Sequence, residues 1–89
     1  MLILDGHIHI IEGGVPHPEM VNRMQQAGVS GGVVISRPPA AYSAVAASAP
    51  PARRMEEAAT WAFSGSELYP FFWIDPTEPD AIEQVEMAV

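Results

Sequence analysis

Cysteine is absent from this chain of 89 residues, and basic residues are scarce. Without cysteine the protein can form neither a disulfide framework nor a thiolate metal site, so any metal must be held by nitrogen and oxygen ligands. Four basic residues stand against eleven acidic ones, which gives a net charge of -7. That charge repels nucleic acid and anionic membrane surfaces, so we expect neither as a partner.

Long apolar runs are absent from the sequence too. No stretch approaches the roughly 20 apolar residues of a membrane span, and no basic segment precedes the apolar start of the chain, as a secretion signal requires. We therefore expect a cytoplasmic protein. Hydrophobic residues still make up 48% of the sequence and charged residues 17%, a composition typical of a folded globular domain.

The most informative stretch is residues 2–11, LILDGHIHII. Side chains of a β-strand alternate between two faces, so Asp5, His7 and His9 are predicted to share one face of a strand. Two histidines at this spacing lie about 6 to 7 Å apart at the backbone, close enough for both rings to bind one metal ion. The pattern predicts a metal site at His7 and His9, with Asp5 behind them. From the spacing alone, two packed or solvated imidazoles are an alternative of similar weight.

Three stretches resemble the amidohydrolase superfamily, in particular its branch of small-molecule hydrolases and metal-dependent decarboxylases. Residues 5–9 are similar to the signature of its first strand, and the histidine pair is the specific part of the likeness. Residues 24–29 are similar to its first helix running into the second strand, and residues 69–81 resemble its third strand and helix. The resemblance covers nearly the whole chain apart from residues 38–54. It implies a (β/α)8 barrel with a divalent metal, most plausibly zinc, and a small organic substrate.

The resemblance also implies roles for individual residues. His7 and His9 would be metal ligands, and Asp5 would orient the site without binding the metal. In the family, the other ligands are a histidine and an aspartate on later strands. Two histidines fall short of the three protein ligands that a catalytic zinc typically needs, so we expect no catalytic residue in this segment and no activity from it alone. A completed barrel would use the metal to activate water against an amide or ester, or would carry out a decarboxylation.

Alternating patterns along the chain predict three consecutive βα units in one partial domain, residues 1–89. Strands are expected at residues 2–11, 31–36 and 68–74, and helices at residues 18–27, 53–63 and 77–89. This order implies a parallel sheet with right-handed crossovers, here the opening part of a TIM barrel. A barrel typically takes about 250 residues, so we expect a truncated reading frame. The inner face of the sheet would be exposed and would favour self-association into a homo-oligomer.

Two further residues are predicted to contact the substrate. Arg37 follows the second strand at the end where barrels place their chemistry, and its guanidinium suits a substrate carboxylate. Trp73, in the third strand, is predicted to line the pocket. An exposed loop arginine and a core tryptophan are the alternatives. The proline-bounded segment 38–52 is expected to be a flap over the site, and His17 is expected to be a solvated or capping residue.

Helical spacing predicts which residues face the sheet. In the second helix these are Met55, Ala59, Ala62 and Phe63. In the third helix they are Ala81, Ile82, Val85, Ala88 and Val89. Residues 75–77 are predicted to form a turn into the third helix, with Thr77 and Asp80 as its capping box.

Two other functions stay open at this point. A phosphoesterase of the polymerase-and-histidinol-phosphatase type also begins with paired histidines on a first strand, and a histidine cluster in later loops would distinguish it. A non-catalytic α/β interaction module, in which both histidines cap a sheet edge, would bind no metal.

Overall fold

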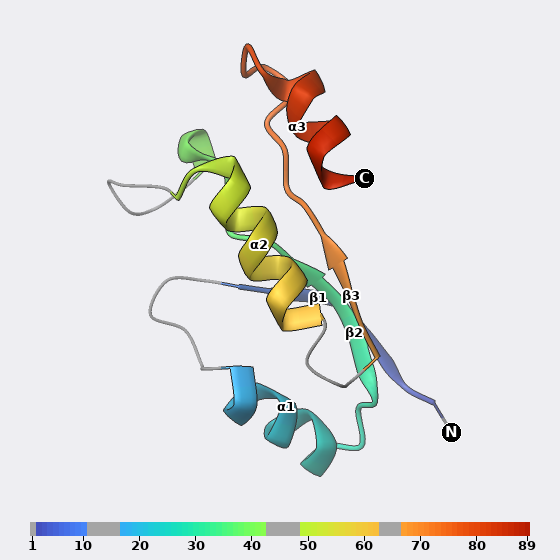
Figure 1. The fold of residues 1–89 in the computed structure, drawn as a ribbon. Coiled ribbons are helices and arrows are strands. Elements are labelled where there is room, and N and C mark those ends of the chain that lie inside the picture. The colour runs from blue at the N-terminus through green and yellow to red at the C-terminus, as the bar shows by residue number, and fades with distance from the viewer. Residues whose placement is uncertain (1, 11–16, 43–48, 63–66) are drawn as a thin grey trace.

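The computed structural model describes residues 2–10, 17–42, 49–62 and 67–89, which form three consecutive βα units (Figure 1). The elements in chain order are β1 (Leu4–His9), α1 (His17–Gln26), β2 (Gly31–Ile35), the short 3-10 helix η1 (Ala40–Tyr42), α2 (Pro51–Ala62), β3 (Glu67–Phe71) and α3 (Ala81–Ala88). The strands pair in the order β1-β2-β3, and both pairings are parallel. The predicted α/β class, the three βα units and the parallel sheet are confirmed.

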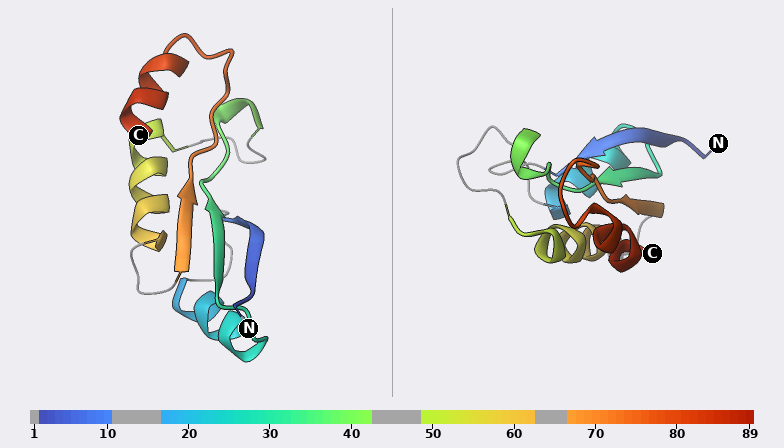
Figure 2. Two further views of the ribbon diagram at one scale, coloured as in Figure 1. Left: turned by 90° about the vertical axis from the view of Figure 1, so that its right-hand side faces the viewer. Right: turned by 90° about the horizontal axis from the view of Figure 1, so that it is seen from above.

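One face of the sheet carries the helices. Helix α2 lies along β3 and β2, α3 follows on the same side near the carboxyl ends of the strands, and α1 lies near their amino ends (Figure 2). The buried apolar core between these layers consists of Ile10, Val34, Ala58, Ala62 and Leu68, with Ile8, Val21, Met24 and Trp61 packed against it. Central strand β2 buries Val34 completely, as expected for a strand with a neighbour on each side.

The other face of the sheet is open to solvent in the described part of the chain. Tyr69 and Phe71 alternate with the buried Leu68 along β3 and are 50% and 59% exposed. These aromatic side chains point away from α2, because neighbouring residues of a strand face opposite sides. The expected exposure of this face is observed, and the self-association that it would favour stays a prediction.

Helix α1 ends at a glycine, close to the predicted end at residue 27. Gly28 has a φ of 78°, in the left-handed region that other residues rarely adopt. The N–H of Val29 donates to the carbonyl of Met24 at 2.9 Å, and the N–H of Gly28 donates to that of Gln25 at 3.1 Å. These two bonds form a Schellman motif, which satisfies carbonyls at the end of the helix.

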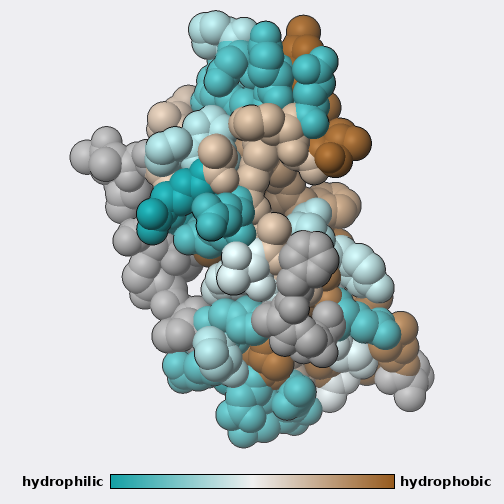
Figure 3. All heavy atoms as spheres, in the orientation of Figure 1, coloured by the Kyte–Doolittle hydropathy of each residue, from teal (hydrophilic) through white to brown (hydrophobic). Residues whose placement is uncertain are grey.

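Helix α3 buries a different side from the one predicted. Gln84 is only 1% exposed, whereas Ile82 is 73% exposed and Val85 and Val89 are exposed too. The Gln84 amide donates to Glu78 Oε2 at 2.7 Å and to Asp80 Oδ1 at 2.8 Å. The predicted apolar stripe is wrong because two carboxylates bind Gln84 on the inner side of the helix. Exposed apolar side chains consequently lie along one side of α3 and at the C-terminus, seen as brown atoms at the right-hand edge of the upper part of Figure 3.

The turn before α3 forms without the predicted capping box. Asp75, rather than Thr77, is the acceptor: its Oδ1 takes hydrogen bonds from the Thr77 N–H at 2.9 Å and the Thr77 hydroxyl at 2.6 Å. Asp80 occupies the N-cap position, but its side chain makes no capping hydrogen bond. The predicted turn at residues 75–77 is confirmed, and the box is wrong because Gln84 engages the Asp80 carboxylate.

Candidate metal site

The rings of His7 and His9 meet beside β1. Their Nε2 atoms are 2.7 Å apart, their centroids are 4.5 Å apart, and the ring planes are inclined by 63°. Both side chains are exposed. The two nitrogens are within hydrogen-bond distance, and the tautomers of the rings decide which of them donates. The prediction that both rings point the same way is confirmed.

A bulge in β1 shapes this arrangement. Asp5 pairs with Gly32 and Ile8 with Val34, so β1 uses one residue more than β2 over the same length. Beyond the bulge, His9 pairs with Ile35. Gly32 and Ile35 lie on opposite faces of β2, since their positions differ by three and side chains alternate between the faces. The prediction that Asp5 shares the face of His9 is therefore wrong. The extra residue in β1 shifts the alternation of side chains, and nothing in the sequence pattern indicates it.

The Asp5 carboxylate contacts the main chain of His7. Its Oδ1 accepts a hydrogen bond from the N–H of His7 at 2.9 Å. This bond spans the bulge and satisfies an N–H that the interrupted ladder leaves over. Asp5 therefore restrains the main chain that carries the first ring. Its role in orienting a metal site stays a prediction.

The histidine pair fits two ligand positions of a divalent ion. With bonds of about 2.0 to 2.1 Å, two ligands of a tetrahedral zinc lie roughly 3.3 Å apart, so the two nitrogens would have to separate by about 0.6 Å from their present distance. Exposed side chains can make so small a movement. Among residues 2–10, 17–42, 49–62 and 67–89, no three histidine, aspartate or glutamate side chains gather around one point. The pair therefore supplies two ligands and leaves the other positions to water or other groups.

An aromatic wall, formed by Tyr42 and Trp73, stands beside the pair. The Trp73 ring lies 5.7 Å from the His9 ring, and the Tyr42 ring stacks on it at 5.9 Å with planes inclined by 28°. The structure thus brings Trp73 to the histidine pair, although β3 ends at Phe71, earlier than predicted. Tyr42 was not predicted as a site residue. Its position in the segment that follows β2 was the available signal, because that segment starts at the same end of the sheet.

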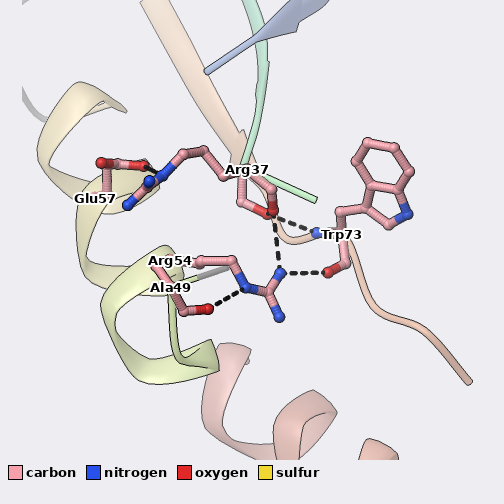
Figure 4. A network of polar contacts seen from close by, with 6 residues as sticks. Arg37, Ala49, Arg54, Glu57 and Trp73 are labelled. Atoms are coloured by element: carbon pink, nitrogen blue, oxygen red, sulfur yellow. Dashed lines mark hydrogen bonds and ion pairs between the residues drawn. The ribbon is translucent and has the colours of Figure 1, made fainter. Parts of the chain in front are cut away.

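Arg37 is not brought to the histidine pair. Its Nε donates to Glu57 Oε1 at 2.8 Å in a half-buried ion pair with α2. Figure 4 shows the Arg37 side chain directed to Glu57 while the indole of Trp73 points the other way. The predicted contact between Arg37 and a substrate would require this ion pair to open, and it stays a prediction.

Arg54 is the polar residue that the sequence analysis missed. It is 1% exposed, and its guanidinium donates to the carbonyls of Ala49, Arg37 and Trp73 at 3.2, 3.1 and 3.0 Å (Figure 4). Burial lowers the pKa of Arg54 below its ordinary value, the nearby Glu78 charge acts in the opposite direction, and the Arg37 charge adds to the lowering. The available signal was helical spacing, because Arg54 precedes the buried Ala58 by one turn.

The rest of the α2 stripe is confirmed only in part. Ala62 is buried as predicted, Met55 and Ala59 are half-buried, and Phe63 lies outside the described residues. His17, expected to be a solvated or capping residue, is half-buried at the first position of α1, and its ring meets that of Trp61 edge-on at 5.0 Å. The predicted flap is described only at its ends, where residues 40–42 form η1 and residues 51 and 52 open α2.

Comparison with models of protein families, with curated proteins and with solved structures gives no match to this chain. The resemblance to the amidohydrolase superfamily therefore stays a prediction. In the described part of the chain, no helix has both the length and the apolar character needed to cross a membrane. The function must be inferred from the geometry around His7 and His9.

Proposed function

We propose that this chain carries part of the metal centre of an amidohydrolase-type hydrolase or of a related decarboxylase. His7 and His9 would hold a divalent cation, zinc foremost, through their Nε2 atoms. The observation that carries this proposal is the approach of these two nitrogens to 2.7 Å on the exposed side of a parallel strand. Neutral imidazole nitrogens are common zinc ligands, and the sequence offers no thiolate that would compete with them.

We also propose that the three βα units are the opening part of a (β/α)8 barrel. In such a barrel the helices cover the outer face of the strands, and the chemistry lies at their carboxyl ends. The packing of α2 along β2 and β3, with Val21 and Met24 of α1 against the same core, supports this proposal. So does the position of the histidine pair, because His9 is the last residue of β1 and Trp73 follows β3.

The outer edge of β3 limits how a fourth strand could pair. The carbonyl of Phe71 accepts a hydrogen bond from Ser36 on the β2 side, so the backbone of Pro70 faces the outer edge. Proline has no N–H to donate there. A fourth strand would therefore lose one ladder hydrogen bond at Pro70 and would pair mainly through Leu68 and Phe72.

The residues around the pair would have distinct tasks. A bound divalent ion would supply Lewis-acid chemistry at a carbonyl oxygen or a water molecule. Asp5 would keep the bulge in shape and so hold His7 in place. The aromatic wall of Tyr42 and Trp73 would exclude water on one side and contact the apolar part of a small organic substrate. Hydrolysis and decarboxylation would use this part of the site alike.

Zinc titration of the whole chain by calorimetry tests the metal site. We expect the native protein to bind zinc and the His7→Ala and His9→Ala variants to lose most of the affinity, because each lacks one of two ligands. The matched control is His17→Ala, which removes the third histidine and should bind zinc like the native chain. No zinc binding by the folded native protein, or binding that both single variants retain, would contradict the proposal and favour a non-catalytic module.

A further inference from the structure

The Arg54 guanidinium lies beside the main chain of Trp73 and donates hydrogen bonds to three separate segments of main chain. Its acceptors are the carbonyls of Ala49, just before α2, of Arg37, after β2, and of Trp73, after β3. The guanidinium also lies 4.8 Å from the centre of the Phe72 ring. A buried cation is costly unless it is fully hydrogen-bonded, so the surrounding segments must keep these positions to accommodate it.

The main chain of Trp73 is held from both sides. Its N–H donates to Ser36 Oγ at 2.9 Å, and its carbonyl accepts from Arg54 Nη1 at 3.0 Å. With both groups fixed, the direction in which the side chain leaves the backbone is fixed as well. The indole then stands 5.7 Å from the His9 ring and supports Tyr42.

We infer that Arg54 is a positioning residue, which sets the Trp73 indole against His9 by holding the main chain at the carboxyl ends of β2 and β3. The use of this wall in substrate binding rests on the proposed function, but the coupling between Arg54 and Trp73 does not. Arginine suits this task because its planar guanidinium directs several donors at once and stacks on an aromatic ring. A lysine ammonium is a point charge and cannot reproduce that fork.

The test follows Trp73 by fluorescence. The chain has two tryptophans, so Trp61→Phe leaves Trp73 as the sole reporter. In that background we compare Arg54→Met, Arg54→Lys and the exposed neighbour Arg53→Met as matched control. Emission wavelength and quenching by acrylamide report the surroundings of the indole, and circular dichroism reports folding.

We expect Arg54→Met to move Trp73 emission to longer wavelength and to raise acrylamide quenching about twofold, since local order at the site loosens. Arg54→Lys should give a smaller change in the same direction, and Arg53→Met none. If Arg54→Met does not fold, Trp73 emission and quenching in Arg54→Lys test the inference instead. A folded Arg54 variant with native Trp73 emission and quenching would overturn the inference.

Zinc titration of the same variants separates this inference from the proposed function. The histidines lie on β1 and Arg54 holds β2 and β3, so folded Arg54 variants should bind zinc as the Trp61→Phe background does. If the native chain binds no zinc, the metal proposal fails while the fluorescence change still supports the role of Arg54. If zinc binds but the emission and quenching of Trp73 are unchanged in the folded Arg54 variants, only the positioning role fails.

Discussion

The hydroxyl of Ser36 accepts a hydrogen bond from the N–H of Trp73 at 2.9 Å, although 37 positions separate the two residues in the chain. The same hydroxyl donates to the carbonyl of Arg37 at 3.1 Å, and the N–H of Ser36 donates to the carbonyl of Phe71 at 2.9 Å. Ser36 thus prolongs the pairing of β2 and β3 past the last residue of either strand. It ties the segment that carries Trp73 to the centre of the sheet.

Replacing Ser36 with alanine should weaken the fold. The buried hydroxyl is the acceptor for the Trp73 N–H, and leaving such a donor unpaired costs about 1 to 3 kcal/mol. Urea denaturation measures the loss in the free energy of unfolding. Ser30→Ala is the matched control, since the exposed Ser30 hydroxyl accepts only a long 3.4 Å bond from Ile3 and should matter by less than about 0.5 kcal/mol. Equal losses in the two variants would show that Ser36 has no special role.

Two glycines of β2 are predicted to tolerate no side chain. A Cβ at Gly31 would overlap the carbonyl oxygen of Glu67, and a Cβ at Gly32 would overlap that of Asp5. Backbone atoms cannot rotate away, so Gly31→Ala and Gly32→Ala should each cost about 3 kcal/mol or more in unfolding free energy. Gly6→Ala is the control in β1, because no atom lies within 4 Å of its Cβ. A Gly31→Ala chain as stable as Gly6→Ala would contradict the close approach of β2 and β3.

The turn at Asp75 should make the stability depend on acid pH. Hydrogen bonds from the Thr77 hydroxyl and then the Thr77 N–H hold the pKa of Asp75 below its ordinary value. A carboxyl with a lower pKa in the folded than in the unfolded chain stabilises the fold above its unfolded pKa of about 3.9, and that contribution is lost as the pH falls through the folded pKa. The free energy of unfolding, measured at a series of pH values from neutral downward, should therefore decline below about pH 3.9.

Two variants assign this acid decline to Asp75. Asp75→Asn keeps an oxygen that can accept from Thr77 but does not titrate, so it should flatten the decline. Thr77→Val removes the hydroxyl that contributes most to the lowered pKa, so it should reduce the decline without abolishing it. An unchanged acid profile in Asp75→Asn would assign the decline to other carboxylates.

Asp5 should matter for metal affinity although we do not propose it as a ligand. Its carboxylate holds the His7 N–H across the bulge, and removing a group that orients a ligand typically costs about tenfold or more in metal affinity. Asp5→Ala should therefore weaken zinc binding in calorimetry, and Asp5→Asn, which can still accept the hydrogen bond, should weaken it less. Glu19→Ala on α1 is a control that removes one negative charge away from the strand. If it weakens zinc binding as much as Asp5→Ala, the effect is one of charge alone.

The sequence by itself determined the order of the elements and the convergence of the histidines. Apolar runs rich in β-branched residues and helical spacing are local patterns, and Gly28 needs only its own backbone freedom to end α1. The common side of His7 and His9 followed from their spacing, because one intervening residue returns a strand to the same face.

Only the tertiary structure decided which side chains meet across these elements. The bulge that removes Asp5 from the face of His9 depends on the pairing of β1 with β2. The inward turn of Gln84 and the burial of Arg54 depend on acceptors that lie elsewhere in the chain, namely two carboxylates for Gln84 and three carbonyls for Arg54. Apolar periodicity counts only hydrophobic burial. It misses polar side chains that are buried because the fold provides their hydrogen-bond partners.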